Sequence, residues 1–587
     1  MWVPDNPTEF DNPDSVLLIA CWHELFDGYT PDSFQPRLHN VASLVEELVE
    51  IAHWWQREPK AFANVKPIKA ELAAAIKSEK DILSRIPTYH SRCLSLVDAK
   101  SPAAIISAGR ILAGQRKIYR NAFELVALEA ISNLPTSKKD AVTSVRRLST
   151  FAFQHGKEDD DAWDPLSKDP TKAPTELFQE MSGLANGVVK DFTCTLTILG
   201  DEQIMNSTVR TMGHRVLSSK SLPDGYAASI GSTNGQPIHV CVNVKAKSIR
   251  EAVAKARDEL ELAIGFASLY RNPAELRLHT TAHVAATGYK RTFLQSEQAF
   301  RRLHPRARAK TDIKGAIKMT AGTVDHRILA AVRQLALASA STDNRTRFIN
   351  LWSALETLAG AHEGENAMDR VRELIIPLVI SRHVHRTTRY MTILTQRFGN
   401  RIGSAAYGLG FRPSETGLVR LDDMLVTLSS TCNDPKIKDL LHFADHPLLR
   451  YRLFDTWKLF HDPKYLRERL IQSQDRLGWQ LARIYRARNL LVHEGQEVRH
   501  IVPLLDNLQN YLSMLVQRLV HETKRKSHHE WDVRHCIEYW NGRMSHVLNG
   551  LKEEPSRLTT RDFLEKCDRI PLWQCAGSAG IGNRPMA

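Results

Sequence analysis

Apolar residues recur at the spacing of an amphipathic α-helix over most of this 587-residue chain, and this periodicity restricts its fold more than any other feature. The pattern is clear from Val41 to Ala52 and again from Ile105 to Ile131. After Val324 it returns with almost no strand signal and predicts helices near 325–340, 345–360, 367–382, 448–460, 465–493 and 499–523. We therefore expect a mostly α fold that ends in a helical bundle.

One stretch departs from this pattern. β-rich segments at Phe192–Ile198 and Ile238–Val244 flank a Gly-rich turn, and a helix is expected from about Ile249 to Tyr270. The predicted organisation is an N-terminal helical region (1–157), a small α/β sensor or regulatory domain (175–290), a basic linker (291–323), the helical bundle (324–525) and a C-terminal extension and tail (526–587).

The charge balance favours an anionic partner. Lys and Arg number 79 against 66 Asp and Glu, which gives a net charge of +13. No run of about 18 apolar residues appears, and the N-terminus lacks the basic and apolar segments of a signal peptide. The eight cysteines form no Cys-x-x-Cys pair. We expect a cytoplasmic protein with no membrane partner.

Several chemistries lose their usual sequence support. The chain has no GxxxxGK[ST] phosphate loop, no HExxH and no GxSxG. An acidic run at Glu158–Asp161 has no fixed ligand spacing. His528, His529, His535 and Cys536 are soft-metal ligands by type, but their spacing fits no standard zinc pattern. We predict neither a metal nor a cofactor, and leave a metal at the histidine cluster as an alternative.

The segment Leu481–Gly495 carries the most chemical information. On a helical projection Arg488 falls within the arc of its apolar neighbours, while Asn489 and His493 lie together at the edge of that arc. An arginine keeps its charge on burial, so this position requires a carboxylate, a partner surface or an anionic ligand. From the residues alone, a structural Arg held by a carboxylate stays open. The similar pair Arg85 and His90 is a decoy, because Pro87 interrupts the helix between them.

This segment resembles the Apea-like group of the HEPN superfamily, whose marker is a helix that ends in Arg, a polar residue, three variable residues and His. Phe348–Leu358, with its Leu-Trp-x-Ala-Leu-Glu core, is similar to an early helix of the same domain, and the two pieces occur in the expected order. The resemblance covers about 200 residues near 325–525, and the interval of about 130 residues between the two pieces suggests one or two extra helices.

The resemblance implies a metal-independent endoribonuclease and a homodimer that combines two motifs. His493 would act as general acid or base, Arg488 would hold the phosphate, and Asn489 would orient the imidazole or contact the phosphate. Glu356 is a candidate counter-ion for Arg488. RNA contacts are predicted at Arg486, Arg301, Arg302, Arg306 and Arg308.

The substrate expected from the resemblance is RNA, with tRNA as one candidate. The role expected is bacterial antiviral defence or that of a toxin, with a phage-derived or nucleotide trigger acting through the N-terminal regions. A non-catalytic HEPN-type module that binds RNA or protein is the main alternative. The solvated-linker interpretation of 301–310 also stays open.

Overall fold

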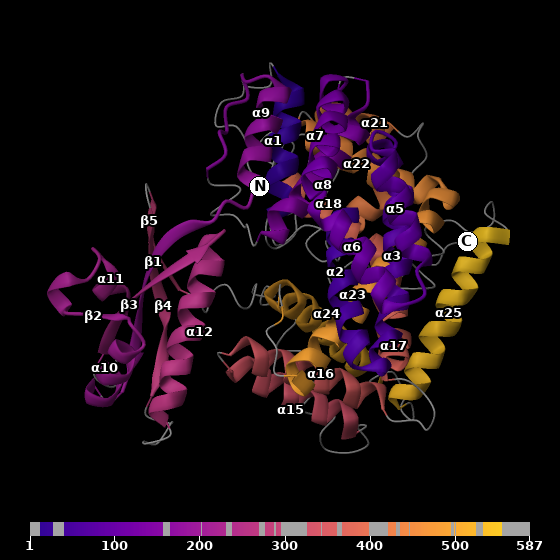
Figure 1. Ribbon diagram of the computed structural model, residues 1–587. Helices are drawn as coiled ribbons and strands as arrows, with labels where there is room; N and C mark the ends of the chain where they lie inside the picture. The colour runs from indigo at the N-terminus through magenta and orange to yellow at the C-terminus, as the bar shows by residue number, and fades with distance from the viewer. Residues whose placement is uncertain are drawn as a thin grey trace, which may run out of the picture. The chain divides into compact units, whose positions relative to one another are not determined.

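The computed structural model describes most of the chain. The described residues are 12–26, 40–134, 136–155, 165–200, 202–230, 237–268, 276–286, 289–294, 326–341, 343–360, 367–397, 421–429, 435–444, 446–494, 498, 501–523 and 532–553. They form a mostly helical protein with one small antiparallel sheet, so the predicted fold class is confirmed at this level (Figure 1). None of the described helices is both long and apolar enough to cross a lipid bilayer.

Contacts divide the chain into two compact units. Unit 1 joins 1–142, 169–174 and 307–587, and unit 2 joins 143–168 and 175–306. The N-terminal helices up to Val142 and the C-terminal bundle thus belong to one unit, although more than 400 residues lie between Arg57 and Asn489. The order of the elements along the sequence suggested a separate N-terminal region. The structure instead groups it with the C-terminal bundle, because segments that are far apart in the sequence pack against each other.

The N-terminal part of the chain is a series of helices. They are α1 (Pro13–Phe26), α2 (Val41–Arg57), the 3₁₀-helix η3 (Pro59–Asn64), α3 (Val65–Ser78), α4 (Lys80–Leu83), α5 (Pro87–Asp98), α6 (Pro102–Gly114), α7 (Arg116–Ser132) and α8 (Lys138–Gln154). Helix α2 begins where the Asn40 side chain accepts a hydrogen bond from the Ser43 amide. It packs closely on α6 at Gly109, where a Cβ would lie 2.1 Å from Cγ2 of Val49.

Unit 2 is built around the sheet. Its elements from Pro174 onward are α9 (Pro174–Ala185), β1 (Lys190–Leu199), α10 (Glu202–Thr211), β2 (Arg215–Leu217), η5 (Ser219–Ser221), α11 (Tyr226–Ile230), β3 (Pro237–Ala246), α12 (Ile249–Ser268), β4 (Arg277–Ala286) and β5 (Tyr289–Leu294). The strand order is β2-β3-β1-β4-β5, with Leu196 opposite Val240 in the antiparallel β1–β3 pair. Helix α12 lies along the sheet (Figure 1) and buries Ala256 and Leu260 in the same core as Leu196.

The C-terminal helices of unit 1 form the predicted bundle and continue it beyond the expected end at 525, because Val533, Cys536 and Trp540 are buried in the same core. They are α15 (His326–Ala340), α16 (Asn344–Ala359), α17 (Ala367–Ser381), α18 (His383–Arg397), α20 (Leu421–Ser429), α21 (Pro435–Phe443), α22 (Pro447–His461), α23 (Pro463–Asn489), the π-helix η7 (Leu490–Glu494), α24 (Ile501–Thr523) and α25 (Val533–Glu553). Five described helices, α17, α18, α20, α21 and α22, lie between the two HEPN-like pieces, which is more than the one or two extra helices expected. Helices α16, α17, α23 and α24 bury a common core that includes Trp352 and Leu481.

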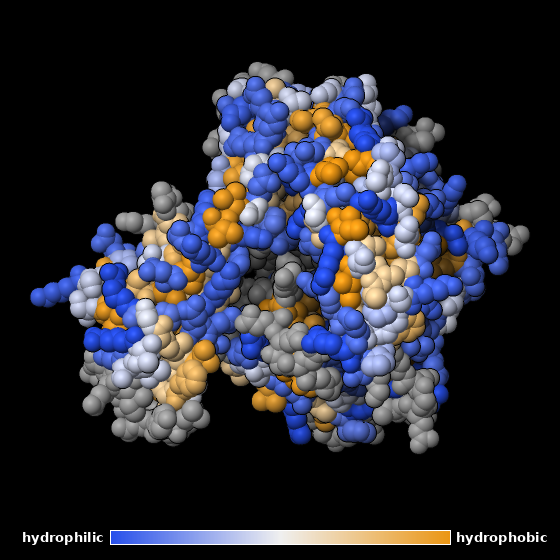
Figure 2. Space-filling model, in the orientation of Figure 1, coloured by the Kyte–Doolittle hydropathy of each residue, from blue (hydrophilic) through white to orange (hydrophobic). Residues whose placement is uncertain are grey.

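The face of the protein in Figure 2 is largely hydrophilic, with apolar residues scattered between the polar ones. Several exposed large apolar side chains belong to the N-terminal helices: Phe62, Leu94, Ile111, Ile118 and Leu125. Single exposed apolar residues are normal on a folded surface, so these positions need no special explanation.

Buried His446 makes the stability of unit 1 depend on pH. It caps α22 by accepting a hydrogen bond from the Leu448 amide at Nδ1, over 3.2 Å, and it is only 3% exposed. Burial lowers the pKa of His446 from 6.5 to about 3. The unfolded chain takes up a proton near pH 6.5 that the folded chain does not, so the stability present above pH 6.5 is lost as the pH falls towards 3.

Because of His446, we expect the free energy of unfolding to be about 2 kcal/mol lower at pH 5 than at pH 7. His446→Asn retains a capping oxygen but no titrating ring, so its melting temperature should fall less between pH 7 and pH 5 than that of the wild type. Melting curves of both proteins at the two pH values check this. An identical drop in both would show that His446 is not the group that titrates.

Candidate active site

The candidate motif lies at the end of the longest helix of the bundle. Helix α23 begins where the Asp462 side chain accepts a hydrogen bond from the Tyr465 amide, over 2.9 Å. Its core-facing side carries Leu481 and Ile484, which are fully buried. Tyr485 packs against Trp352 of α16 with ring centroids 5.6 Å apart. The two sequence segments that carry the HEPN resemblance therefore contact each other in the folded protein.

Arg488, Asn489 and Glu356 come together at this point. The Arg488 guanidinium donates to Oδ1 of Asn489 over 3.1 Å, and its Nη2 lies 3.7 Å from a carboxylate oxygen of Glu356. The Glu356 side chain is 29% exposed and that of Arg488 is 24% exposed. The pairing of Arg488 with Glu356 was a sequence-based expectation, and the structure brings these residues within ion-pair distance.

The burial of Arg488 differs from the helical projection. The projection put Arg488 within a buried arc that included Leu491 and Val492, but Arg488 is only partly buried and Val492 is 44% exposed. The reason is that α23 ends at Asn489, and the next residues form the π-helix η7. A projection at the α-helical angle does not apply beyond that point. The guanidinium of Arg488 therefore reaches the surface, where an anionic ligand can approach it.

The π-helix also changes the relation between positions 488 and 493. In an α-helix, residues five apart are turned by about 140° from each other. A π-helix closes its hydrogen bonds from i to i+5, so residues five apart return to nearly the same side. The backbone of His493 lies within Leu490–Glu494, and its side chain is outside the described part of the structure. Position 493 is therefore turned less far from Arg488 around the helix axis than it would be in an unbroken α-helix.

Arg486 does not lie where an RNA contact was predicted. Its side chain is buried and forms an ion pair with Glu47 of α2. Arg483, one turn earlier, is also buried and binds both Glu47 and Glu71. Because a buried, paired guanidinium is not accessible to RNA, the assignment of Arg486 to RNA binding is corrected to a structural contact. The sequence offered no signal for it, since the carboxylates lie more than 400 residues away.

The other predicted RNA contacts, Arg301, Arg302, Arg306 and Arg308, lie outside the described residues, as do the acidic run and the histidines at 528 and 529. Of the residues left open as an alternative metal site, His535 is exposed and pairs with Asp532 over 2.8 Å, whereas Cys536 is fully buried. In the part of the chain that the structure describes, no group of three or more His, Cys, Asp or Glu side chains is arranged to hold a metal.

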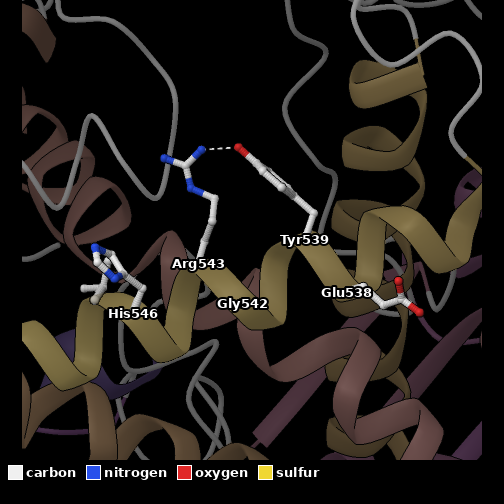
Figure 3. Close-up of a pocket in the computed structure, with 6 residues that line it drawn as sticks. Glu538, Tyr539, Gly542, Arg543 and His546 are labelled. Carbon is white, nitrogen blue, oxygen red and sulfur yellow. Dashed lines mark hydrogen bonds between the residues drawn. The ribbon is translucent and has the colours of Figure 1, made fainter.

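A pocket of about 470 Å³ lies elsewhere in unit 1, along α25. Figure 3 shows that Tyr539 and Arg543 extend to one side of the helix and bond to each other, while Glu538 extends to another side. All the lining residues come from one helix, and the acidic and basic groups do not converge on a common point. We do not assign chemistry to this pocket.

The motif on α23 offers a different arrangement. A partly exposed guanidinium is held by an amide and a carboxylate, and a histidine follows on the π-helix. A guanidinium held in this way can bind an oxyanion, and a histidine can donate or accept a proton. No family model matches this chain, and no curated protein or solved structure matches it.

Proposed function

We propose that this protein is a metal-independent endoribonuclease of the HEPN type, with Arg488, Asn489 and His493 as its catalytic residues. The observation that carries the proposal is the conformation of the chain at 488–494. Arg488 is bonded to Asn489 and lies beside Glu356 at a partly exposed helix end, and the π-helix that follows bears His493. A π-helical turn is rare, and it is frequently found at functional sites.

The chemistry follows from what RNA supplies. The 2′-hydroxyl is an internal nucleophile, so cleavage requires proton transfer and stabilisation of the negative charge on the pentacoordinate phosphorus. An imidazole with an ordinary pKa near 6.5 is suited to the proton transfer, which is the role of His493. Arg488 stabilises the developing charge through charge-assisted hydrogen bonds. Glu356 and Asn489 hold the guanidinium in place before the substrate binds.

Cleavage is expected to persist in EDTA and to leave a 2′,3′-cyclic phosphate or a 3′-phosphate. The reason is that the proposed mechanism uses the 2′-oxygen as nucleophile and side chains as the acid, the base and the charge stabiliser. Incubation of the full-length protein with total cellular RNA in EDTA, followed by mapping of the cut ends, measures this. Loss of activity on chelation, rescue by a divalent ion and 3′-hydroxyl products would together rule the mechanism out.

A composite site across a homodimer is part of the proposal. One Arg and one His are a small set for phosphodiester cleavage, and the partial exposure of Arg488 leaves room for a second copy of the motif to approach. We expect the active species to be at least a dimer, so that specific activity falls when the protein is diluted to the monomer. Analytical ultracentrifugation paired with cleavage assays over the same concentration range checks this. A fully active monomer would contradict a composite site.

The second candidate is a non-catalytic helical module that binds RNA or a partner protein. The presence of Arg488, Asn489 and His493 together in the sequence favours the enzyme, because a binding module does not need a general acid or base. RNA that is bound but uncut by the active oligomer would favour the module. The further proposal is a cytoplasmic effector of antiviral defence or a toxin, with unit 2 as the sensor or regulatory domain for a phage-derived or nucleotide trigger.

A further inference from the structure

A cluster of four charges, three of them buried and one partly buried, contacts the end of α23 from the N-terminal helices. We call Glu47 of α2, Glu71 of α3, Arg483 and Arg486 the buried ion-pair cluster. Arg483 binds Glu47 with two nitrogens, at 3.0 and 2.9 Å, and binds Glu71 at 2.5 Å. Arg486 donates to Oε1 of Glu47, which Nε of Arg483 also contacts. The exposed fractions of the side chains are 3% for Glu71, 6% for Arg486, 7% for Arg483 and 17% for Glu47.

Such a cluster is costly to bury. Taking charges out of water costs several kcal/mol per ion, and replacement of a buried ion pair by apolar residues is often neutral or stabilising. Burial raises the pKa of Glu71, against the opposing effect of Arg483. An apolar contact would give a similar or greater stability without this cost, so what the charges add is a defined geometry. A guanidinium bound by two carboxylates in a fork restricts the orientations open to the helix that carries it.

The place of the cluster on α23 connects it with the candidate site. Arg483 and Arg486 come five and two residues before Arg488, and at about 100° per residue Arg486 and Arg488 lie on nearly opposite sides of the helix. The last turns of α23 are therefore held on one side by the cluster and on another by the core around Leu481 and Ile484. Arg488 occupies the remaining, partly exposed edge.

The π-helix makes this support necessary. An isolated π-helical turn is a rare conformation, and a sparsely populated backbone conformation persists only where the surrounding structure determines it. Since η7 begins directly after Asn489, any tilt or rotation of the end of α23 moves both Arg488 and the backbone of position 493. A displacement of about 1 Å in a catalytic group is enough to cost about 10²-fold in rate.

We infer that Glu47 and Glu71 of the N-terminal helices are positioning residues for the site at Arg488, acting through Arg483 and Arg486. The N-terminal helical region is then a structural part of the nuclease unit and sets the catalytic geometry. This inference rests on the proposed function for its effect on RNA cleavage, while its effect on the conformation of α23 can be measured independently.

The test compares Glu47→Gln with a matched control, Glu24→Gln. Glu24 of α1 is likewise buried, at 1% exposed, and it binds Arg452 of α22 and Tyr390 of α18, away from the end of α23. Both variants should lower the melting temperature of the full-length protein. Glu47→Gln alone should lower kcat for RNA cleavage, by about tenfold or more with KM nearly unchanged, because the substrate still binds to misplaced groups.

Hydrogen–deuterium exchange supplies the readout that does not require activity. Amides in 483–494 should exchange faster in Glu47→Gln than in the wild type, and at the wild-type rate in Glu24→Gln. If Glu47→Gln does not fold, Glu71→Gln serves as the milder variant. Glu71 is paired with Arg483, whereas Glu47 is paired with both Arg483 and Arg486.

The outcomes separate the two proposals. The positioning role would be overturned by two results together. In Glu24→Gln and Glu47→Gln, kcat would fall in the same proportion to the loss in melting temperature, and exchange in 483–494 would not change in either variant. A wild-type protein that does not cleave RNA in EDTA would overturn the proposed function, and the exchange measurement would still decide whether the cluster holds the helix end.

Discussion

His493→Ala is expected to lower the rate of RNA cleavage by about 10²-fold or more, because loss of a general acid or base typically costs about 10² to 10⁴. RNA binding should be nearly unchanged, since the phosphate contact depends mainly on Arg488. His90→Ala is the matched control, because Pro87 begins α5 and leaves Arg85 outside the helix that carries His90. Cleavage rates, binding constants and melting temperatures of the three proteins measure this.

Substitutions of Arg488 extend the same experiment. Arg488→Ala should also abolish cleavage, and Arg488→Lys should restore it only in part, because an ammonium lacks the fork that binds phosphate through two nitrogens. If His493→Ala cleaves as the wild type does while His90→Ala does not, the wrong motif has been chosen, and the nuclease proposal for the bundle should be abandoned.

Arg483→Ala is expected to lower the free energy of unfolding of unit 1 by about 3–5 kcal/mol. The physical reason is that removal of one partner from a buried ion pair leaves an uncompensated charge. Here both Glu47 and Glu71 lose a contact, and Glu71 is only 3% exposed. This loss is a large share of the stability of an ordinary protein. Urea unfolding followed by circular dichroism measures it.

An exposed ion pair provides the comparison for Arg483. Arg85 and Glu129 are paired on the surface, with side chains that are 42% and 56% exposed. Arg85→Ala should change the unfolding free energy by less than about 1 kcal/mol, because exposed pairs are screened by solvent. Equal effects of Arg85→Ala and Arg483→Ala would mean that the buried ion-pair cluster does not hold α2 and α3 to α23 in solution.

The prediction of the helices was accurate where the periodicity was strong. The helices expected at 325–340, 345–360 and 367–382 end within a residue or two of α15, α16 and α17. The strands at Phe192–Ile198 and Ile238–Val244 lie within β1 and β3. The strands β4 and β5 were not predicted. In β4 the polar residues Thr281 and His283 are buried with the apolar ones, so the strand lacks the alternation that identifies a half-exposed strand.

The sequence by itself determined the mostly helical class, the position of the small α/β unit and the residues of the candidate motif, because these depend on local periodicity and residue chemistry. Only the tertiary structure decided which arginine of α23 is exposed. The sequence placed Arg488 among apolar neighbours and Arg486 in contact with RNA. In the structure, carboxylates from α2 and α3 bury Arg483 and Arg486, while Arg488 lies partly exposed beside Glu356. Contacts between residues more than 400 positions apart determine which arginine is exposed, and the local sequence pattern cannot predict such contacts.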